Sequence, residues 1–261
     1  MPFFQANGLE YYRFDSLGEA VVHAVFTRKG GVSPQPWSTL NLGGTVGDSR
    51  ENVVENRRRI FETLGIKVAT IFDVWQVHSD KVIITNKPRP LDQPHEKADA
   101  ILTNNPEVTL FMRFADCVPI LLYDPVRRVV GLIHAGWMGT VQQITSKTVL
   151  LMREHFDSNP ADILAGIGPS IGADHYIIRE DVAQKVKESF GEDSVKILHT
   201  NGNTIHLDLW AANEILLRKI GVKSVEVSNQ CTACDLERWF SHRAEQGKTG
   251  RFAALIKLPQ G

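Results

Sequence analysis

The sequence has few cysteines, no long apolar run and no excess of charge of one sign. Three cysteines in 261 residues are too few for a disulfide scaffold, and the start shows no secretory signal, so we expect reduced thiols in the cytoplasm. No apolar stretch approaches the roughly 18 residues that span a membrane. The 29 basic and 30 acidic residues give a formal charge of −1, which argues against a nucleic-acid partner.

The chain also lacks internal repeats, low-complexity segments and long linkers. Its length and its 43% hydrophobic residues allow a sizeable core without a disulfide or metal. The stretch richest in proline and charge, residues 87–97, is typical of one surface loop. We therefore expect a single catalytic domain over residues 1–261.

Helix boundaries are indicated at four places. A capping box at 48–51 precedes a helix that ends at Gly65. Thr140 is suited to cap a second helix, and Asp208 caps one that ends at Gly221. A further amphipathic helix ends at Gly191.

Runs of β-branched and aromatic residues predict strands at 21–27, 71–77, 82–85, 109–115, 118–123, 129–134, 163–167, 225–228 and 252–258. Asn201-Gly202 is typical of a type I′ turn between two further short strands. The strands partly alternate with helices but also form hairpins. This pattern predicts a mixed α/β layered sandwich with mixed sheets rather than a wholly parallel sheet.

The segment 115–137 contains the most informative arrangement. Two apolar strands flank a turn around Val126, with Cys117 nine residues before it and His134 eight residues after it. A hairpin closed at this turn places the two side chains nearly opposite each other, with Cβ atoms about 4.5–5.5 Å apart. That distance suits either a thiolate–imidazole pair or a shared metal ion.

His78, which follows another predicted strand, is a third candidate. His, Cys and His at strand ends match a catalytic zinc site with an open fourth position. The simpler interpretation, a buried cysteine and two core or surface histidines, fits the residues as well because the three lie far apart in the chain.

Ordered motifs run through nearly the whole chain: FTRKGGVS (26–33), NLGGTVGD (41–48), ENRRR (55–59), WQVHSDKV (75–82), ADAILTN (98–104), ADCVPILLYDP (115–125), HAGWMGT (134–140), GIGPSIG (166–172), CT (231–232) and FSHR with KTGR (240–251). With them the chain resembles the family named after multicopper polyphenol oxidoreductase, also called the peptidoglycan editing factor or purine nucleoside phosphorylase family. The resemblance implies a mixed α/β sandwich related to cysteine hydrolases. It also implies zinc, or alternatively copper, held by His78, Cys117 and His134.

The resemblance further implies phosphorolysis of adenosine, inosine, guanosine and methylthioadenosine, together with deamination of adenosine. Cys117 would be a catalytic thiolate ligand, and Asp116 would orient a histidine or move a proton. Candidate residues for binding the nucleoside and phosphate are Arg28, Asn41, Trp137 and Arg243. Met138 departs from the family, which usually has an arginine there; that arginine either contacts an anionic substrate group or only packs on the helix.

Two other functions stay open. A Cys117–His134 pair suits acyl transfer and predicts an amidase that edits UDP-muramyl-L-serine cell-wall precursors. Copper-dependent polyphenol oxidation has less support, because a multicopper site needs about ten histidine ligands. This chain has nine histidines and no H-x-H pair.

Two further motifs are interpreted as structural. Gly168 to Gly172 fits the G-x-S-x-G pattern, but no helix is expected directly after Ser170, as a nucleophile elbow requires. Cys231 and Cys234 form a C-x-x-C pair, and three cysteines cannot build a four-cysteine zinc site. We interpret this pair as two reduced thiols near the wall of the site.

Overall fold

Two six-stranded mixed sheets lie face to face in the computed structural model, which describes residues 2–260. The first sheet has the order β1 (Phe3–Ala6), β2 (Leu9–Tyr12), β3 (Val22–Phe26), β15 (Phe252–Lys257), β7 (Thr109–Phe114), β4 (Ile71–Asp73). The second has the order β14 (Ser224–Val227), β10 (Leu164–Ile167), β8 (Val118–Asp124), β9 (Val129–Ala135), β6 (Ala100–Thr103), β5 (Val82–Ile84). Each sheet combines antiparallel and parallel pairs. The predicted mixed α/β fold is confirmed.

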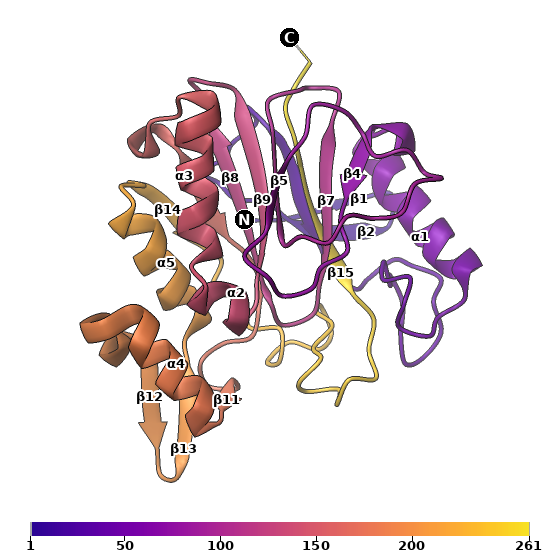
Figure 1. Ribbon diagram of the computed structural model, residues 1–261. Coiled ribbons are helices and arrows are strands. Elements are labelled where there is room, and N and C mark those ends of the chain that lie inside the picture. The colour runs from indigo at the N-terminus through magenta and orange to yellow at the C-terminus, as the bar shows by residue number, and fades with distance from the viewer. Residues whose placement is uncertain (1, 261) are drawn as a thin grey trace.

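Helices cover the outer faces of both sheets (Figure 1). The helices α2 (Trp137–Val141), α3 (Ile144–Phe156), α4 (Glu180–Phe190) and α5 (Leu209–Lys219) lie on the side of the second sheet. Helix α1 (Arg50–Thr63) covers the first sheet. A small sheet of β11 (Ile177–Ile178), β13 (Thr204–Leu207) and β12 (Leu198–Asn201) lies beside α4. No helix within residues 2–260 is long and apolar enough to cross a membrane.

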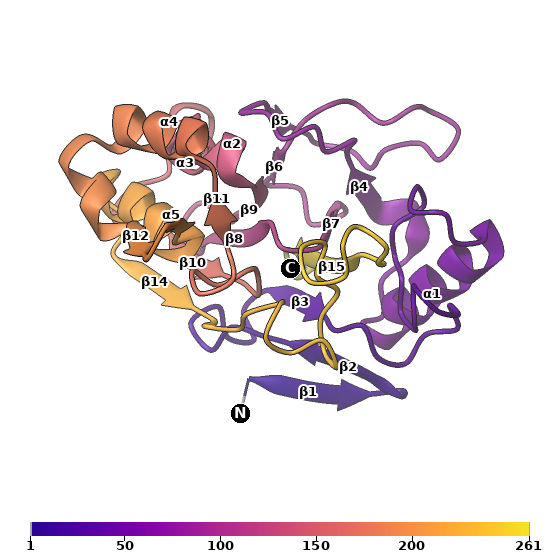
Figure 2. The same cartoon turned by 90° about the horizontal axis from the view of Figure 1, so that it is seen from below.

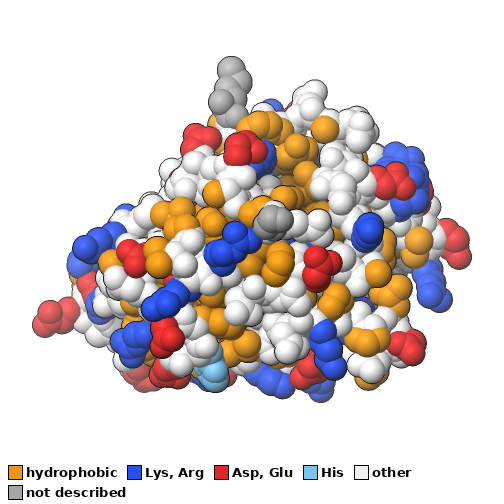
Figure 3. Space-filling view, turned by 90° about the horizontal axis from the view of Figure 1, so that it is seen from above, with side chains coloured by type: hydrophobic (Ala, Val, Ile, Leu, Met, Phe, Trp, Pro, Cys, Tyr) orange, Lys and Arg blue, Asp and Glu red, His pale blue; other side chains and the backbone are white. Residues whose placement is uncertain are grey.

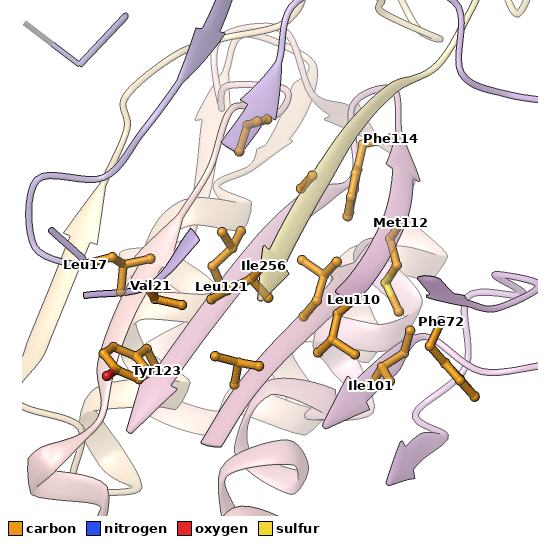
Figure 4. Packing of buried hydrophobic residues seen from close by; sticks show 14 of the residues in the cluster. Leu17, Val21, Phe72, Ile101, Leu110, Met112, Phe114, Leu121, Tyr123 and Ile256 are labelled. Carbon is orange, nitrogen blue, oxygen red and sulfur yellow. The ribbon is translucent and has the colours of Figure 1, made fainter. Parts of the chain in front are cut away.

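The main core lies between the two sheets (Figure 4). Alternate residues of β8 serve different layers, because side chains along a strand alternate between its faces. Leu121 and Tyr123 belong to the core between the sheets, whereas Ile120 and Leu122 pack in the cluster under α3 and α5. Strand β8 is therefore buried on both faces, as its continuous apolar run indicates.

The predicted helix starts have mixed outcomes. Asp208 caps α5 as predicted. Ser49 caps α1, one residue after the start of the predicted capping box at Asp48. Each accepts a hydrogen bond from the backbone N–H three residues later. The prediction for Thr140 is wrong, because this residue lies inside α2 and its hydroxyl accepts a hydrogen bond from Asn213. Helix α3 instead follows Gln143, which adopts a left-handed backbone conformation.

The predicted type I′ turn is also wrong in detail. Asn201 pairs with Thr204, so the two loop residues are Gly202 and Asn203. Gly202 has a φ of 57° and Asn203 is not among the residues with positive φ, which matches a type II′ turn. Strands β1, β2, β6 and β11 were not predicted; the first two form a hairpin across Asn7-Gly8.

Strands β8 and β9 bring the candidate site to one end of the second sheet. Strand β8 begins directly after Cys117, and β9 ends just past His134, close to the start of α2. The segment between β14 and β15 runs across this end of the molecule (Figure 2). On the opposite face, acidic and basic side chains are interspersed rather than gathered by sign (Figure 3).

Candidate metal centre

His78, Cys117 and His134 form a three-residue group. Their ligand atoms all lie within 4.8 Å of one another, and the Cys117 Sγ atom is 3.7 Å from the His78 Nε2 atom. The hairpin register pairs His134 with Pro119, so Cys117 lies just beyond the strand and diagonal to His134. His134 is buried, Cys117 is partly exposed and His78 is exposed. The group therefore opens to solvent on the side of His78.

Two residues of this site have unusual backbone conformations. His78 has a φ of 60° and Asp116, which precedes Cys117, has a φ of 81°. Non-glycine residues rarely adopt positive φ, and such strain of about 1–3 kcal/mol per residue concentrates at functional sites. His78 is itself a candidate ligand, and Asp116 lies in the short connection between β7 and β8, next to Cys117.

Asp99 is hydrogen-bonded to two of the three residues of the group, His134 and His78. Its fully buried carboxylate accepts a hydrogen bond of 2.9 Å from His134 Nδ1, and others from the backbone N–H groups of His78 and Ser79 at 3.0 and 2.6 Å. A carboxylate on one ring nitrogen fixes the tautomer of a histidine and frees the other nitrogen for a metal. His134 is thereby left with Nε2 facing the group.

Charges within the site shift three pKa values. Burial alone would raise the pKa of Cys117, but His134 and His78 outweigh it and lower that pKa to about 6. Burial would lower the pKa of His134, but Cys117 and Asp99 raise it to about 9. Burial opposes ionisation of Asp99, yet hydrogen bonds from His134 and Ser79 lower its pKa to about 2. Without a metal, the site therefore favours a thiolate beside an imidazolium.

Asp116 lies next to Cys117 but does not contact a histidine through any hydrogen bond of the described chain. One carboxylate oxygen accepts the Thr232 hydroxyl at 2.7 Å, and the other accepts the Arg243 backbone N–H at 2.6 Å. The expected orientation of a histidine by Asp116 is corrected, because Asp99 has that position. Asp116 instead ties the loop of Cys117 to the segment between β14 and β15.

The predicted substrate-binding residues are not brought together. Arg28 is buried and donates to three backbone oxygens and to Glu245, beside an open pocket of about 360 Å³. Asn41 is fully buried and bonds to Gly43, Asp48 and the backbone of Arg251. The polar groups of Arg28 and Asn41 are therefore used in hydrogen bonds that connect loops.

Trp137 and Arg243 have different surroundings. The Trp137 ring packs against the cluster under the helices, with the Lys185 ammonium 5.5 Å from its centre. Arg243 is exposed, and its guanidinium lies 5.0 Å from the Tyr176 ring centre and donates to the Ile177 carbonyl. Arg243 is therefore the candidate whose charged group is exposed, while its backbone N–H group binds Asp116.

Sequence reasoning missed Asp99 and Tyr176, and it named Arg251 only as one of three arginines suited to phosphate or ribose. The Cys117 thiolate acts on the pKa values of both Arg251 and Tyr176, which places the two residues near the group. Asp99 lies in the ADAILTN motif at the start of β6, and β6 pairs with β9 so that Ala100 lies opposite Ile133. The motif was a usable signal, but the pairing of β6 with β9 was not predicted.

The fold and the site together define a mixed α/β protein with a His-Cys-His group. Cys117 and His134 lie at the ends of β8 and β9, whereas His78 lies in the loop between β4 and β5, because the predicted strand 71–77 ends at Asp73. Residues 22–259 match the family model described as multi-copper polyphenol oxidoreductase laccase. The chain belongs to this family, and the suspected membership is confirmed.

Relatives carry the name purine nucleoside phosphorylase. The one from Deinococcus radiodurans is 39% identical and the match covers 98% of this chain and 95% of the relative. The relative from Bacillus subtilis, named purine nucleoside phosphorylase YlmD, is 35% identical, and the match covers 92% of this chain and 89% of the relative. The crystal structure of YlmD from Geobacillus stearothermophilus has a TM-score of 0.92 and 32% identity, with 99% of both chains covered.

Proposed function

We propose that this chain is a zinc-dependent purine nucleoside phosphorylase in one catalytic domain. Its substrates would be adenosine, inosine, guanosine and methylthioadenosine with inorganic phosphate, and it would also deaminate adenosine. The observation that carries the proposal is the His78–Cys117–His134 group, open to solvent on one side. The names of the relatives support the reaction class.

The donors present fit a zinc ion. Two imidazoles and one thiolate are ligands that zinc prefers, and three protein ligands leave a fourth position for a substrate. When bound, zinc supplies a Lewis acid that polarises an oxygen and lowers the pKa of water. The same donor set also accepts copper, so metal analysis of the purified protein distinguishes the two.

The chain's own residues prepare this site. Asp99 keeps the Nδ1 proton on His134 and so directs Nε2 toward the group. His134 and His78 favour the thiolate form of Cys117. Asp116 fixes the Cys117 loop through Thr232 and Arg243, which makes it a positioning residue in this proposal.

Two arginines are suited to bind phosphate. Arg251 is largely buried, and nearby Cys117 and Asp116 favour its charge against the burial that lowers its pKa. Arg243 presents an exposed guanidinium over the Tyr176 ring, and its backbone N–H group donates to Asp116. Guanidinium groups match phosphate oxygens in pairs, so we assign phosphate to these two arginines. Arg28 and Asn41 then support the loops.

The proposal is tested by chromatography of products from zinc-loaded protein given adenosine, with and without phosphate. We expect adenine and ribose 1-phosphate only with phosphate, and inosine without it. Cys117→Ala and His78→Ala abolish both products, whereas the exposed control His199→Ala retains them. Unchanged adenosine in the presence of zinc and phosphate contradicts the proposal.

A second candidate function is that of a cysteine amidase. It is supported by the arrangement of Cys117, His134 and Asp99, in which His134 lies between the thiol and the carboxylate. A thiolate, a histidine and an orienting carboxylate are the parts of a cysteine amidase. Its substrate would be a UDP-muramyl-L-serine precursor. Release of serine by metal-free protein, lost in Cys117→Ala and also lost when zinc is added, would favour the amidase over the phosphorylase.

A further inference from the structure

Outside the candidate metal centre, Asp174, His175, Cys231 and Cys234 gather in a second cluster. Their ligand atoms all lie within 4.8 Å of one another. Asp174 and His175 come from the turn before β11, and both cysteines come from the turn after β14. Neither cysteine is in a disulfide. We propose that this cluster is a second zinc site, separate from the first and independent of the proposed function.

Three of the four ligand–ligand distances in the cluster fall in the range expected around a tetrahedrally coordinated ion, and the fourth is slightly shorter. Ligand atoms about 2.0–2.3 Å from zinc lie about 3.3–3.8 Å from one another at tetrahedral angles. His175 Nδ1 is 3.5 Å from Cys234 Sγ and 3.8 Å from Cys231 Sγ. Asp174 Oδ2 is 3.6 Å from Cys234 Sγ and 3.1 Å from His175 Nδ1. These four edges outline a site with two sulfur, one nitrogen and one oxygen ligand.

The backbone next to the cluster offers a hydrogen-bond donor to a cysteine sulfur. The Gly172 N–H group points at Cys231 Sγ, 3.2 Å away, as a donor to sulfur. A Cβ atom at Gly172 would lie 2.7 Å from Asp174 Oδ1 and 3.3 Å from Cys231 Sγ, so any larger residue would crowd two ligands. Backbone hydrogen bonds from Ser170 to Gln230 and from Thr232 to Ser170, of 3.1 and 3.0 Å, join the two turns.

The second site is accessible and lies close to the first. Asp174, His175 and Cys234 are exposed, so a metal ion can enter from solvent. Thr232, between the two cysteines, donates its hydroxyl to Asp116. Zinc at the second site would therefore fix the turn whose Thr232 binds Asp116, the residue next to Cys117. When zinc binds, each cysteine thiol releases its proton to solvent.

Zinc binding to the full-length protein under reducing conditions tests this assignment. In a Cys117→Ala background, which disables the first site, we expect about one zinc ion per chain to survive gel filtration. Adding Cys234→Ala, or separately His175→Gln, reduces this to near zero, whereas His199→Ala leaves it unchanged. These changes are at exposed side chains, and circular dichroism verifies folding.

Alkylation provides an independent readout. Zinc protects Cys231 and Cys234 from N-ethylmaleimide in the Cys117→Ala protein, and the protection disappears with His175→Gln. Equal zinc content in Cys117→Ala with and without Cys234→Ala would overturn the proposal. So would complete alkylation of both cysteines in the presence of excess zinc.

Discussion

At the scale of single residues, the candidate metal centre depends on a carboxylate that is not one of its ligands. Asp99 joins β6 to the turn of His78 and to the ring of His134. The side chains of Val77 and Ser79 flank the same turn, and their backbone N–H groups also point at Asp99. One buried carboxylate thus sets the position of two candidate ligands.

We predict that Asp99→Asn weakens zinc binding at this centre by about 10–100-fold, because loss of an outer-shell carboxylate releases the histidine ring. Competition with a chromophoric chelator measures the affinity. The exposed Asp92→Asn is the matched control and leaves the affinity unchanged. An unchanged affinity in Asp99→Asn would show that Asp99 does not orient His134.

A second buried carboxylate, Asp73, affects stability rather than the site. It contacts Arg89, Arg113 and His95 at 2.7–2.9 Å. Burial would raise the pKa of Asp73, but His95 and the two arginines hold it well below the usual range. Because its folded pKa is depressed, its stabilisation is present above about pH 4 and is lost as the pH falls.

We therefore predict that Asp73→Asn lowers the free energy of unfolding at pH 7 by about 3–5 kcal/mol, since it leaves two largely buried arginines without their partner. The difference from the unmodified protein narrows below about pH 4. Denaturant unfolding at several pH values measures it. Glu62→Gln, which removes an exposed pair with Arg58, serves as control. A pH-independent difference would contradict this account.

At the scale of elements, the junction of β9 and α2 limits the volume of the centre. A Cβ atom at Gly136 would lie 3.0 Å from both Cys117 Sγ and His78 Cδ2. Gly136 has an ordinary extended φ of −76°, so its requirement is for space rather than for an unusual backbone conformation.

We predict that Gly136→Ala weakens zinc binding about 10-fold, because a crowded methyl group costs about 1–3 kcal/mol when the ligands must shift. Isothermal titration with zinc measures the change. Gly44→Ala is the control, since nothing lies within 4 Å of its added methyl group. If both variants bind zinc equally well, the close packing at Gly136 is not needed.

Elements with a strong local pattern could be predicted from the sequence, and elements that depend on distant partners could not. The β8–β9 hairpin has continuous apolar runs around one turn, so the approach of Cys117 to His134 follows from local pairing. Strand β6 is only four residues long, and its pairing with β9 is a tertiary contact. The position of Asp99 depends on that contact.

The roles of loop residues were harder to predict from the sequence than the positions of strands. Arg28 and Asn41 follow strands in glycine-rich loops, a pattern shared by residues that bind ligands and residues that hold loops together. Three of the four hydrogen bonds from the Arg28 side chain are to residues 208 to 217 positions away in the chain, which no local pattern reports. C-x-x-C spacing likewise did not indicate that His175 and Asp174 lie beside it.

At the scale of the whole molecule, stability depends on the contact between the two sheets. Leu110 of β7 and Leu121 of β8 are fully buried in the same cluster, from opposite sheets. We predict that Leu110→Ala lowers the free energy of unfolding by about 2–5 kcal/mol, through lost burial and a cavity. Thermal and denaturant unfolding measure it. The control Leu91→Ala, at a side chain that is 69% exposed, changes the free energy of unfolding little. If the two variants lose the same free energy of unfolding, the assignment of the core is wrong.

Titrating zinc into metal-free protein tests whether the proposed phosphorolysis depends on a metal bound by His78, Cys117 and His134. Adenine release from adenosine and phosphate is followed at each addition. We predict no release without zinc, a rise that follows occupancy of this group, and no rise in Cys117→Ala. Full phosphate-dependent release by metal-free protein, or by zinc-loaded Cys117→Ala, would contradict it.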